Sequence, residues 1–189
     1  MKKESLKISV VPTSVQTEML CARNGLTLTN LVEYPELDLA IDGADQVDLK
    51  TLNLVKGAGG ALTREKVVAC AAKTFAIVVD QEKTVKEGLS ERVPVEVVPF
   101  SAGFVMREII RIRGKPLLRE SAGKLGPVVT DNGNYIIDVD FGKIDSPRKL
   151  DRRLKMIPGI IETGLFCGLV DVVYVGKRDG TVQTVRRKK

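Results

Sequence analysis

One eleven-residue segment gathers most of the groups in this chain that could do chemistry. It reads Lys56-Gly57-Ala58-Gly59-Gly60-Ala61-Leu62-Thr63-Arg64-Glu65-Lys66. Glycines let backbone N–H groups approach a ligand oxygen, and a helix expected to begin near Thr63 adds the positive end of its dipole. The segment is therefore a candidate cradle for an anion or a developing oxyanion, although a plain tight turn would use the same glycines. It contains neither the Walker pattern nor Gly-x-Gly-x-x-Gly.

Glu65 occupies the first turn of that expected helix. An acidic residue at this place commonly does no more than complement the helix dipole. A carboxylate close to Lys56, Asp42 and an oxyanion cradle is, however, what abstraction of a proton next to a carbonyl requires. Burial would raise the pKa of this carboxyl, whereas the dipole favours its charged form, and the sequence leaves that balance open.

Two further groups of polar residues follow apolar runs. Asp42-Gly43-Ala44-Asp45 comes directly after Leu39-Ala40-Ile41. Two aspartates at this spacing can form an Asx-type turn, contact sugar hydroxyls or bind Mg²⁺. Asp80 follows another apolar run and Lys83 comes three residues later. Taken alone, Asp80 is expected to cap a turn and Lys83 to lie at the surface.

The composition limits the reactions that these groups can support. The 189 residues include no histidine, which excludes Ser-His-Asp and Cys-His relays and the usual His-containing zinc sites. The three cysteines are far apart and odd in number, which argues against a disulfide framework or a structural metal site. Acid–base chemistry must therefore come from carboxylates, lysines, tyrosines or a cofactor.

The net charge of +6 gives little reason to expect a nucleic-acid-binding protein. Four of the basic residues are the last four, 186–189, and a solvated tail is the simpler interpretation, with weak attraction to phosphate or RNA as the alternative. Aromatic residues make up 4% and tryptophan is absent, so no stacking platform is indicated. The chain shows neither a signal-peptide pattern nor a membrane-length apolar run, and we expect a cytoplasmic protein.

Residues 6 to about 90 show short apolar runs alternating with helical patterns, which is typical of parallel strands joined by crossovers. The strands are nearly continuously apolar, so we expect a doubly wound sheet covered on both faces. The carboxyl ends of such strands are where ligands collect. We expect strands at 6–11, 37–41, 52–55 and 75–79, and helices at 14–24 and 63–73.

After Val93 the pattern of apolar and polar residues changes. We expect a helix at 102–113, a turn at 131–134, a charged, solvent-facing helix at 148–157 and a strand at 160–163. Strands at 171–175 and 181–185, joined by an Asp-Gly turn, are expected to form a hairpin that rejoins the first sheet. This pattern predicts an α/β domain formed by residues 1–90 and 171–189, and a small α+β subdomain with an antiparallel sheet over 91–170.

Several of these motifs, in this order, strongly resemble those of the type A ribose-5-phosphate isomerases. The resemblance runs from about Val10 to Val185 and implies a Rossmann-like, mostly parallel sheet domain of the ribose-5-phosphate isomerase/CoA-transferase kind with a smaller α+β subdomain. The motifs that carry it are Asp42 to Asp45, Lys56 to Lys66, Asp80 with Lys83, Pro94 to Pro99, Gly126 to Asn134, Ile157 to Ile160 and Gly164 to Phe166.

The resemblance implies interconversion of ribose 5-phosphate and ribulose 5-phosphate through an enediolate, a step of the non-oxidative pentose phosphate pathway, without a metal or organic cofactor. Glu65 then matches the family's general base. Lys56 and the N–H groups from Gly57 through Ala58 to Gly59 match the groups that hold the enediolate oxygens. The segment Asp42-Gly43-Ala44-Asp45 matches the sugar-binding loop, whose aspartates assist ring opening and proton transfer between oxygens. Lys83 matches a second substrate lysine.

Two departures from the family pattern bear on these expectations. Gln46 stands where the family commonly has glutamate, and we expect altered affinity rather than a lost reaction. The family's N-terminal strand and its phosphate-binding Gly-Thr-rich loop would precede Met1, so we expect either that the sequence is truncated or that phosphate is held differently. The alternative function is that of a sugar-phosphate-binding or catalytically impaired homologue. An exposed sheet edge invites pairing with another chain. With the family's usual assembly, this leads us to expect a homodimer or homotetramer, with no specific nucleic-acid partner and no membrane association.

Overall fold

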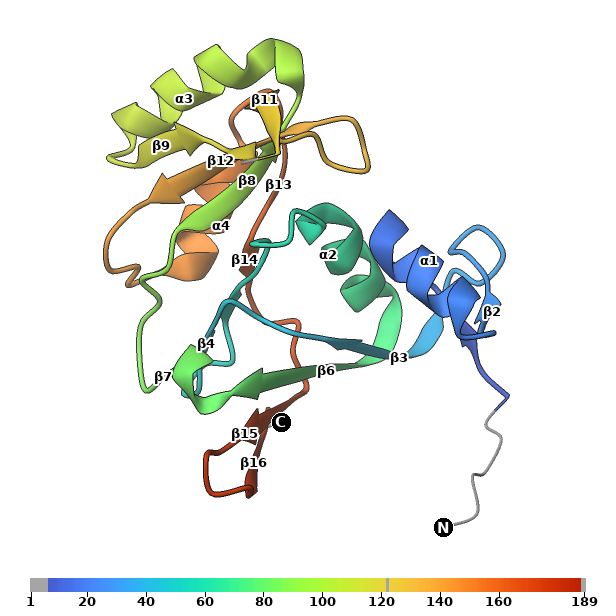
Figure 1. Ribbon diagram of the computed structural model, residues 1–189. Coiled ribbons are helices and arrows are strands. Elements are labelled where there is room, and N and C mark those ends of the chain that lie inside the picture. The colour runs from blue at the N-terminus through green and yellow to red at the C-terminus, as the bar shows by residue number, and fades with distance from the viewer. Residues whose placement is uncertain (1–6, 122, 188–189) are drawn as a thin grey trace.

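The computed structural model describes residues 7–121 and 123–187 (Figure 1). The chain forms a mostly parallel sheet, a small antiparallel sheet and helices that connect and cover them. The helices are α1 (Val15–Arg23), α2 (Leu62–Ala71), α3 (Ala102–Arg111) and α4 (Pro147–Lys155), with the 3-10 turns η1 (Gln81–Lys83) and η2 (Pro99–Ser101).

The first sheet has the strand order β16-β15-β6-β3. Its strands are β3 (Leu37–Asp42), β6 (Ala72–Asp80), β15 (Val172–Gly176) and β16 (Val182–Arg186). The three strands β3, β6 and β15 run parallel, and β16 returns antiparallel through a hairpin, with Gly180 at φ 82°. The predicted mixed α/β sheet with mostly parallel strands is confirmed, and so is the hairpin that rejoins it.

A second sheet, with the order β14-β5-β4-β7, is an addition to what the sequence predicts. It consists of four short strands: β4 (Gln46–Asp48), β5 (Leu54–Val55), β7 (Thr84–Val85) and β14 (Leu165–Phe166). Lys56 follows β5 directly, and the backbone N–H of Lys56 donates to the Gly164 carbonyl just before β14 (2.9 Å). This second sheet therefore fixes the backbone from which Lys56 projects.

The antiparallel sheet of the predicted small subdomain has the order β13-β8-β12-β9. Its strands are β8 (Val93–Val97), β9 (Lys115–Leu118), β12 (Tyr135–Asp140) and β13 (Ile160–Thr163), with α3 between β8 and β9 and α4 between β12 and β13. This βαββαβ arrangement is ferredoxin-like. A two-stranded excursion, β10 (Glu120–Ser121) with β11 (Lys124–Pro127), extends from it.

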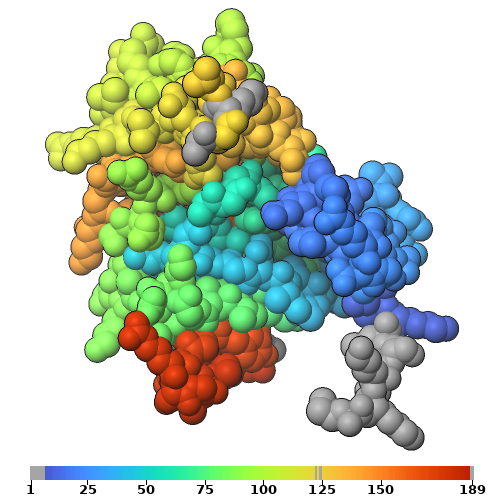
Figure 2. Space-filling view, in the orientation of Figure 1, coloured from blue at the N-terminus to red at the C-terminus, as the bar shows by residue number. Residues whose placement is uncertain are grey.

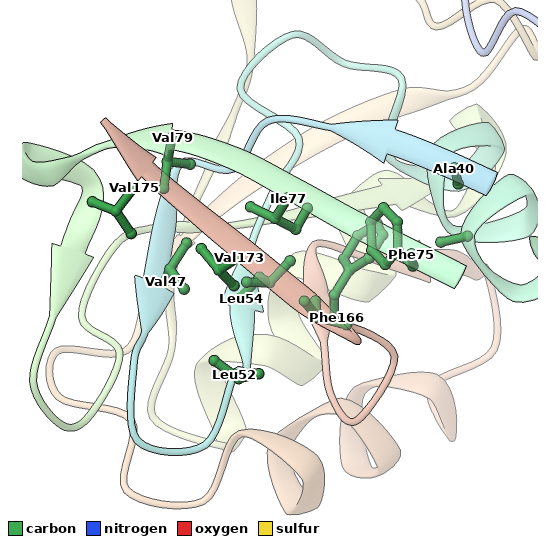
Figure 3. Packing of buried hydrophobic residues seen from close by; sticks show 12 residues of the cluster. Ala40, Val47, Leu52, Leu54, Phe75, Ile77, Val79, Phe166, Val173 and Val175 are labelled. Carbon is green, nitrogen blue, oxygen red and sulfur yellow. The ribbon is translucent and has the colours of Figure 1, made fainter. Parts of the chain in front are cut away.

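The apolar side chains form two buried clusters. One lies around the first two sheets, where the rings of Phe75 and Phe166 are 6.4 Å apart (Figure 3). The other joins the small sheet to α3 and α4 through residues such as Val95, Ile109 and Leu154. Because Val93, Val95 and Val97 alternate along β8, the side chain of Glu96 between them faces the opposite side, toward α2.

Several expectations for the N-terminal region are wrong. The first strand is only β1 (Ser9–Val10), which pairs with β2 (Thr27–Leu28) and not with the main sheet, while Leu6 lies outside the described residues. Helix α1 begins after Ser14 as predicted, but it buries none of its residues. Figure 2 shows this segment, in dark blue, on one side of the molecule.

The main sheet is not covered on both faces in the described structure, which contradicts the expectation of a doubly wound sheet. Leu39, Ile41 and Val78 are 52%, 65% and 52% exposed. Helix α2 packs on the other face of β3 and β6, and it also contacts the small sheet (Figure 1). The sequence pattern indicated apolar strands correctly, but apolar content alone does not say which face is covered.

The expected solvent-facing helix is exposed, and so are the described residues of the expected basic tail, Arg186 and Arg187, while Lys188 and Lys189 lie outside the described residues. Arg148, Arg152 and Arg153 of α4 are exposed, as predicted. Arg186 ends β16, and Arg187 Nε donates to the Val170 carbonyl (2.8 Å), so these two residues are fixed to the sheet. Within the described residues, no helix is both long enough and apolar enough to traverse a bilayer.

Candidate active site

Three elements bring their polar residues together around one buried lysine. Asp42 ends β3, Lys56 follows β5, and Glu65 lies in the first turn of α2. Lys56 Nζ lies 3.0 Å from Asp42 Oδ2 and 3.2 Å from Glu65 Oε2, and it donates to the Gly43 carbonyl at 2.7 Å. The structure thus brings together three of the four residues predicted to be catalytic in one charge cluster.

The ammonium group of Lys56 is held in place by its surroundings. Its side chain is 4% exposed, and its Nζ lies 5.6 Å from the centre of the Phe166 ring. A Cβ at Gly164 would lie 2.2 Å from the Lys56 carbonyl, so only glycine permits this close approach of the two backbones. Lys56 is therefore a fixed positive charge rather than a mobile surface group.

Glu65 is the group in this cluster that lacks a full set of partners. Its Oε2 atom is buried and accepts no hydrogen bond from the described part of the chain. The pKa of the Glu65 carboxyl is raised: burial is the largest cause, the Lys56 charge opposes it, and the nearby charge of Asp42 adds to it. Burial therefore outweighs the stabilising charge of Lys56. A desolvated carboxylate whose buried oxygen has an ion-pair partner in Lys56 but no well-aligned hydrogen bond is suited to accept a proton.

The glycine loop lies beside this cluster and is tied to the second aspartate. The Ala58 N–H donates to Asp45 Oδ2 at 2.9 Å. Gly57 adopts φ 112°, and a Cβ there would lie 3.1 Å from both Leu62 and Pro94, so the loop needs glycine at this position. Helix α2 has Ala61 as its N-cap, without a side-chain cap. The N–H groups at this helix end are thus left for other acceptors.

The remaining predicted site residues are placed less tightly. Gly43 joins the cluster through its carbonyl, which accepts from Lys56, and its N–H donates to Asp42 Oδ1 (2.8 Å). Asp80 caps η1 as expected, and Lys83 in that turn is exposed. For Lys83, no side-chain bond to the cluster is found among the described residues.

Gln46 lies outside the charge cluster. It is buried, and its Oε1 accepts from the backbone N–H groups of Ser90 (2.7 Å) and Glu91 (3.2 Å). Its amide thus fixes a neighbouring loop. Among the described residues, no group of three or more histidine, cysteine or acidic side chains is arranged to hold a metal ion.

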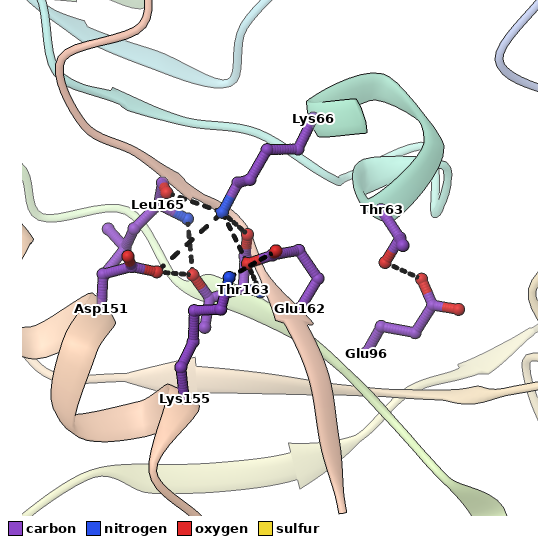
Figure 4. A network of polar contacts seen from close by, with 8 residues as sticks. All are labelled: Thr63, Lys66, Glu96, Asp151, Lys155, Glu162, Thr163 and Leu165. Atoms are coloured by element: carbon purple, nitrogen blue, oxygen red, sulfur yellow. Dashed lines mark hydrogen bonds and ion pairs between the residues drawn. The ribbon is translucent and has the colours of Figure 1, made fainter. Parts of the chain in front are cut away.

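Two networks that the sequence did not reveal hold the first turn of α2 from both sides (Figure 4). On one side Glu96, fully buried on β8, accepts from Thr63 Oγ1. It also accepts from Thr130 Oγ1 (2.9 Å) and from the side-chain amides of Asn132 (3.0 Å) and Asn134 (2.9 Å). A carboxylate in an otherwise apolar strand was the available signal for this network.

On the other side of the turn, Lys66 Nζ donates to Glu162 Oε1 (2.8 Å) and to the carbonyls of Thr163 (2.7 Å) and Leu165 (2.9 Å). Thr63 and Lys66 flank Glu65 in sequence. Thr63 is bound to β8 of the antiparallel sheet, and Lys66 is bound to β13 of that sheet and to β14. The position of Glu65 is therefore set by contacts on both sides of its helical turn.

Comparison with known proteins agrees with this geometry. Residues 9–180 match the family model of ribose 5-phosphate isomerase A (phosphoriboisomerase A). The chain is 48% identical to ribose-5-phosphate isomerase A of Methanosarcina acetivorans over 188 residues, which cover 100% of this chain and 79% of that protein.

Solved structures of similar proteins have the same fold. The structure of ribose 5-phosphate isomerase A from Methanocaldococcus jannaschii superimposes with a TM-score of 0.88 at 41% identity, covering 94% of this chain and 77% of that one. A D-ribose-5-phosphate isomerase in complex with phospho-erythronic acid superimposes with a TM-score of 0.91 at 42% identity, covering 95% and 78%. The sequence, the fold and the arrangement of the lysine–carboxylate cluster lead to one conclusion: the chain belongs to the ribose 5-phosphate isomerase A family.

Proposed function

We propose that Glu65 is the general base of the reaction that this family catalyses. As a member of the family, the chain interconverts ribose 5-phosphate and ribulose 5-phosphate, an aldose–ketose isomerisation of the pentose phosphate pathway. The observation that supports the assignment of Glu65 is its buried Oε2 atom, which lacks a hydrogen bond while lying 3.2 Å from Lys56 Nζ. Proton abstraction next to a carbonyl needs such a base beside a positive charge.

In the aldose-to-ketose direction, Glu65 would remove the proton from the second sugar carbon. The electron pair of that C–H bond becomes the C1–C2 double bond, and the carbonyl oxygen takes up negative charge. Glu65 then returns the proton to the first carbon, while the hydroxyl proton passes from the second oxygen to the first. The sum is an isomerisation, with no net gain or loss of electrons or protons.

Lys56 and the N–H groups of the glycine loop, residues 57–59, would stabilise the enediolate oxygens. A buried ammonium group and oriented amides act most strongly where water is excluded and need no reorganisation during the reaction. Asp42 and Asp45 would contact the sugar, assist ring opening and relay the proton between the two oxygens. They lie at the same end of β3, which supports a shared role.

The other residues of the predicted sugar site have more peripheral roles in this proposal. Gly43 and Ala44 would line the sugar site through their backbone, and Lys83 would add a second positive charge for the substrate. Lys83 is exposed beside η1, so its contribution is to binding. We further propose that the chain acts in the cytoplasm as a homodimer or homotetramer, the assembly expected from the resemblance. The relatives carry the isomerase name at high identity, which does not favour a merely sugar-phosphate-binding or impaired homologue.

The test is the turnover of ribose 5-phosphate by the wild-type chain and by Glu65→Gln. The amide keeps the shape of the side chain but cannot accept the proton, so kcat should fall by about 10³-fold, within the range for lost general base catalysis. Glu18→Gln is the matched control, because Glu18 is the acidic residue in the first turn of α1 and is exposed.

If Glu65 only complemented the helix dipole, the two substitutions would have similar, small effects. Equal rates for the wild type and Glu65→Gln would remove Glu65 from the mechanism. Measuring kcat and KM separately distinguishes a lost proton acceptor from weakened binding.

A further inference from the structure

The glycine loop is held from its far side by an arginine that the sequence motifs do not single out. Arg119 follows β9 of the small sheet. Its Nη1 atom donates to the carbonyls of Gly57 (2.9 Å) and Ala58 (3.0 Å). One guanidinium nitrogen thus binds two successive peptide groups of the loop proposed to hold the enediolate oxygens.

The guanidinium group is itself fixed. Its Nε donates to Asp138 Oδ2 at 2.7 Å and its Nη2 to Asp138 Oδ1 at 2.5 Å, which is a two-point contact with a carboxylate on β12. The two side chains are 16% and 19% exposed. The Arg119 backbone is held by the Ile136 carbonyl and the Val128 N–H. The donor therefore has little freedom to move, and neither does any peptide bound to it.

Because the peptide bond is planar, the hydrogen bonds from Arg119 to the carbonyls also set the direction of the N–H groups in the same peptides. In a trans peptide the C=O and the following N–H point in opposite directions. Since the Gly57 carbonyl faces Arg119, the Ala58 N–H must face away from it, and there it meets Asp45 Oδ2 at 2.9 Å. Since the Ala58 carbonyl also faces Arg119, the Gly59 N–H is directed away as well. Within the described residues that N–H has no backbone acceptor.

We propose that Arg119, fixed by Asp138, is a positioning residue that orients the peptides of residues 57–59 so that their N–H groups face Asp45 and the substrate oxygens. This inference rests on the proposed function of the loop and deepens it. The guanidinium charge also polarises the Gly57–Ala58 peptide, which strengthens the bond that this peptide donates to Asp45. Arg119 itself acts only through the loop, because it contacts the carbonyl side of these peptides.

The first test replaces Arg119 by methionine, which keeps the length of the stem and removes every donor. We expect turnover to slow by a factor of about 30 or more, on the order of the 10² that loss of one oriented donor or a misplacement of 1 Å costs, while KM for ribose 5-phosphate changes less than about threefold. Arg111→Met is the matched control, since Arg111 lies exposed on α3 and its ion-pair partner among the described residues is Glu108.

A second readout separates positioning from loss of folded protein. Phospho-erythronic acid has a carboxylate that can accept from the same N–H groups as the enediolate oxygens. Its inhibition constant should rise in Arg119→Met roughly in step with the fall in turnover. A smaller active fraction would lower the apparent kcat without changing KM or the inhibition constant, and that result would overturn the proposal.

Arg119→Lys covers the case in which the methionine variant does not fold. Lysine keeps the charge opposite Asp138 but cannot bind a carboxylate at two points and two carbonyls at once. We expect turnover to slow about tenfold, whereas a rate within about twofold of wild type would overturn the proposal. Glu65→Gln tells the two hypotheses apart. An inactive Glu65→Gln beside fully active Arg119 variants refutes only the positioning role, and an active Glu65→Gln refutes the proposed function.

Discussion

Lys56 and Lys66 lie against the same aromatic ring, with Nζ atoms 5.6 Å and 4.9 Å from the centre of Phe166. Both lysines are buried and both pair with carboxylates. Lys66 donates three short hydrogen bonds, and its partner Glu162 is bound by Lys155 as well. Around Lys56, by contrast, Glu65 retains a buried oxygen without a hydrogen bond from the described residues.

The two glutamates have opposite pKa shifts, because burial and the nearby charges of Asp42 and Asp45 act on Glu65, whereas Glu162 lies between two lysines. Burial raises the pKa of both carboxyls. At Glu162 the charge of Lys66 and the hydrogen bonds from Lys155 and Lys66 outweigh burial, so the pKa is lowered. At Glu65 burial outweighs Lys56, and the pKa is raised. The same residue types at similar side-chain exposure thus make a structural ion pair where every group is hydrogen-bonded, and a candidate reactive site where one group is not.

Substitution of the lysine in the reactive cluster should have the largest effect. Lys56→Met removes the buried positive charge proposed to stabilise the enediolate oxygens, so we expect kcat to fall by about 10³-fold. Steady-state kinetics with ribose 5-phosphate measure this. Lys50→Met is the control, because the Lys50 pair with Glu87 is largely exposed. Retention of a tenth or more of the wild-type rate would contradict the assigned role.

Substitution of Lys66, whose cluster is fully hydrogen-bonded, should lower the stability of the fold and have little effect on turnover. Lys66→Met leaves the Thr163 and Leu165 carbonyls without this donor and removes one of the two lysines paired with Glu162, so the free energy of unfolding should fall by about 3 kcal/mol. Urea denaturation measures it, while turnover by the folded variant should stay within about tenfold of wild type. Lys155→Met removes a more exposed partner of Glu162 and should cost about 1 kcal/mol at most. A fall in the turnover of folded Lys66→Met by clearly more than tenfold, with little change in its free energy of unfolding, would contradict the contrast between the two clusters.

The smallest expected effect follows from the opposite pKa shifts. The free energies of unfolding of Glu65→Gln and Glu162→Gln, each relative to wild type, should change with pH in opposite directions. As pH rises above 4.5, the unfolded chain releases the Glu65 proton before the folded chain does, so this carboxyl lowers stability up to its folded pKa. Glu162 stabilises the fold above pH 4.5, and that contribution is lost as pH falls through its folded pKa.

The measurement is the free energy of unfolding of each variant relative to wild type at pH 4 and pH 7. The difference should increase with pH for Glu65→Gln and decrease for Glu162→Gln. Taking differences cancels the other titrating groups. A change of the same sign in both variants would show that the two carboxyls do not differ in the way described.

Local features of the fold followed from the sequence because they depend on residues that are close in the chain. Ser14 caps α1, Gly25 ends it at φ 69°, and Asp179-Gly180 forms the last hairpin. The hydrophobic periodicities of helices and strands, and the turn residues with special backbone angles, can be recognised from short stretches of sequence. The residue types and order of the site motif also singled out three residues that the fold brings together, Asp42, Lys56 and Glu65.

The features that the sequence did not predict depend on groups that are far apart in the chain. The pairing of β1 with β2 away from the main sheet, and the exposed face of β3, reflect which neighbours are available to pack. Arg119 binds Gly57 across 62 positions, and Glu96 reaches Thr63 across 33. Whether Glu65 is short of hydrogen bonds, and Glu162 is not, is set by every atom around each carboxylate. Desolvation is a property of the folded environment, and no local pattern encodes it.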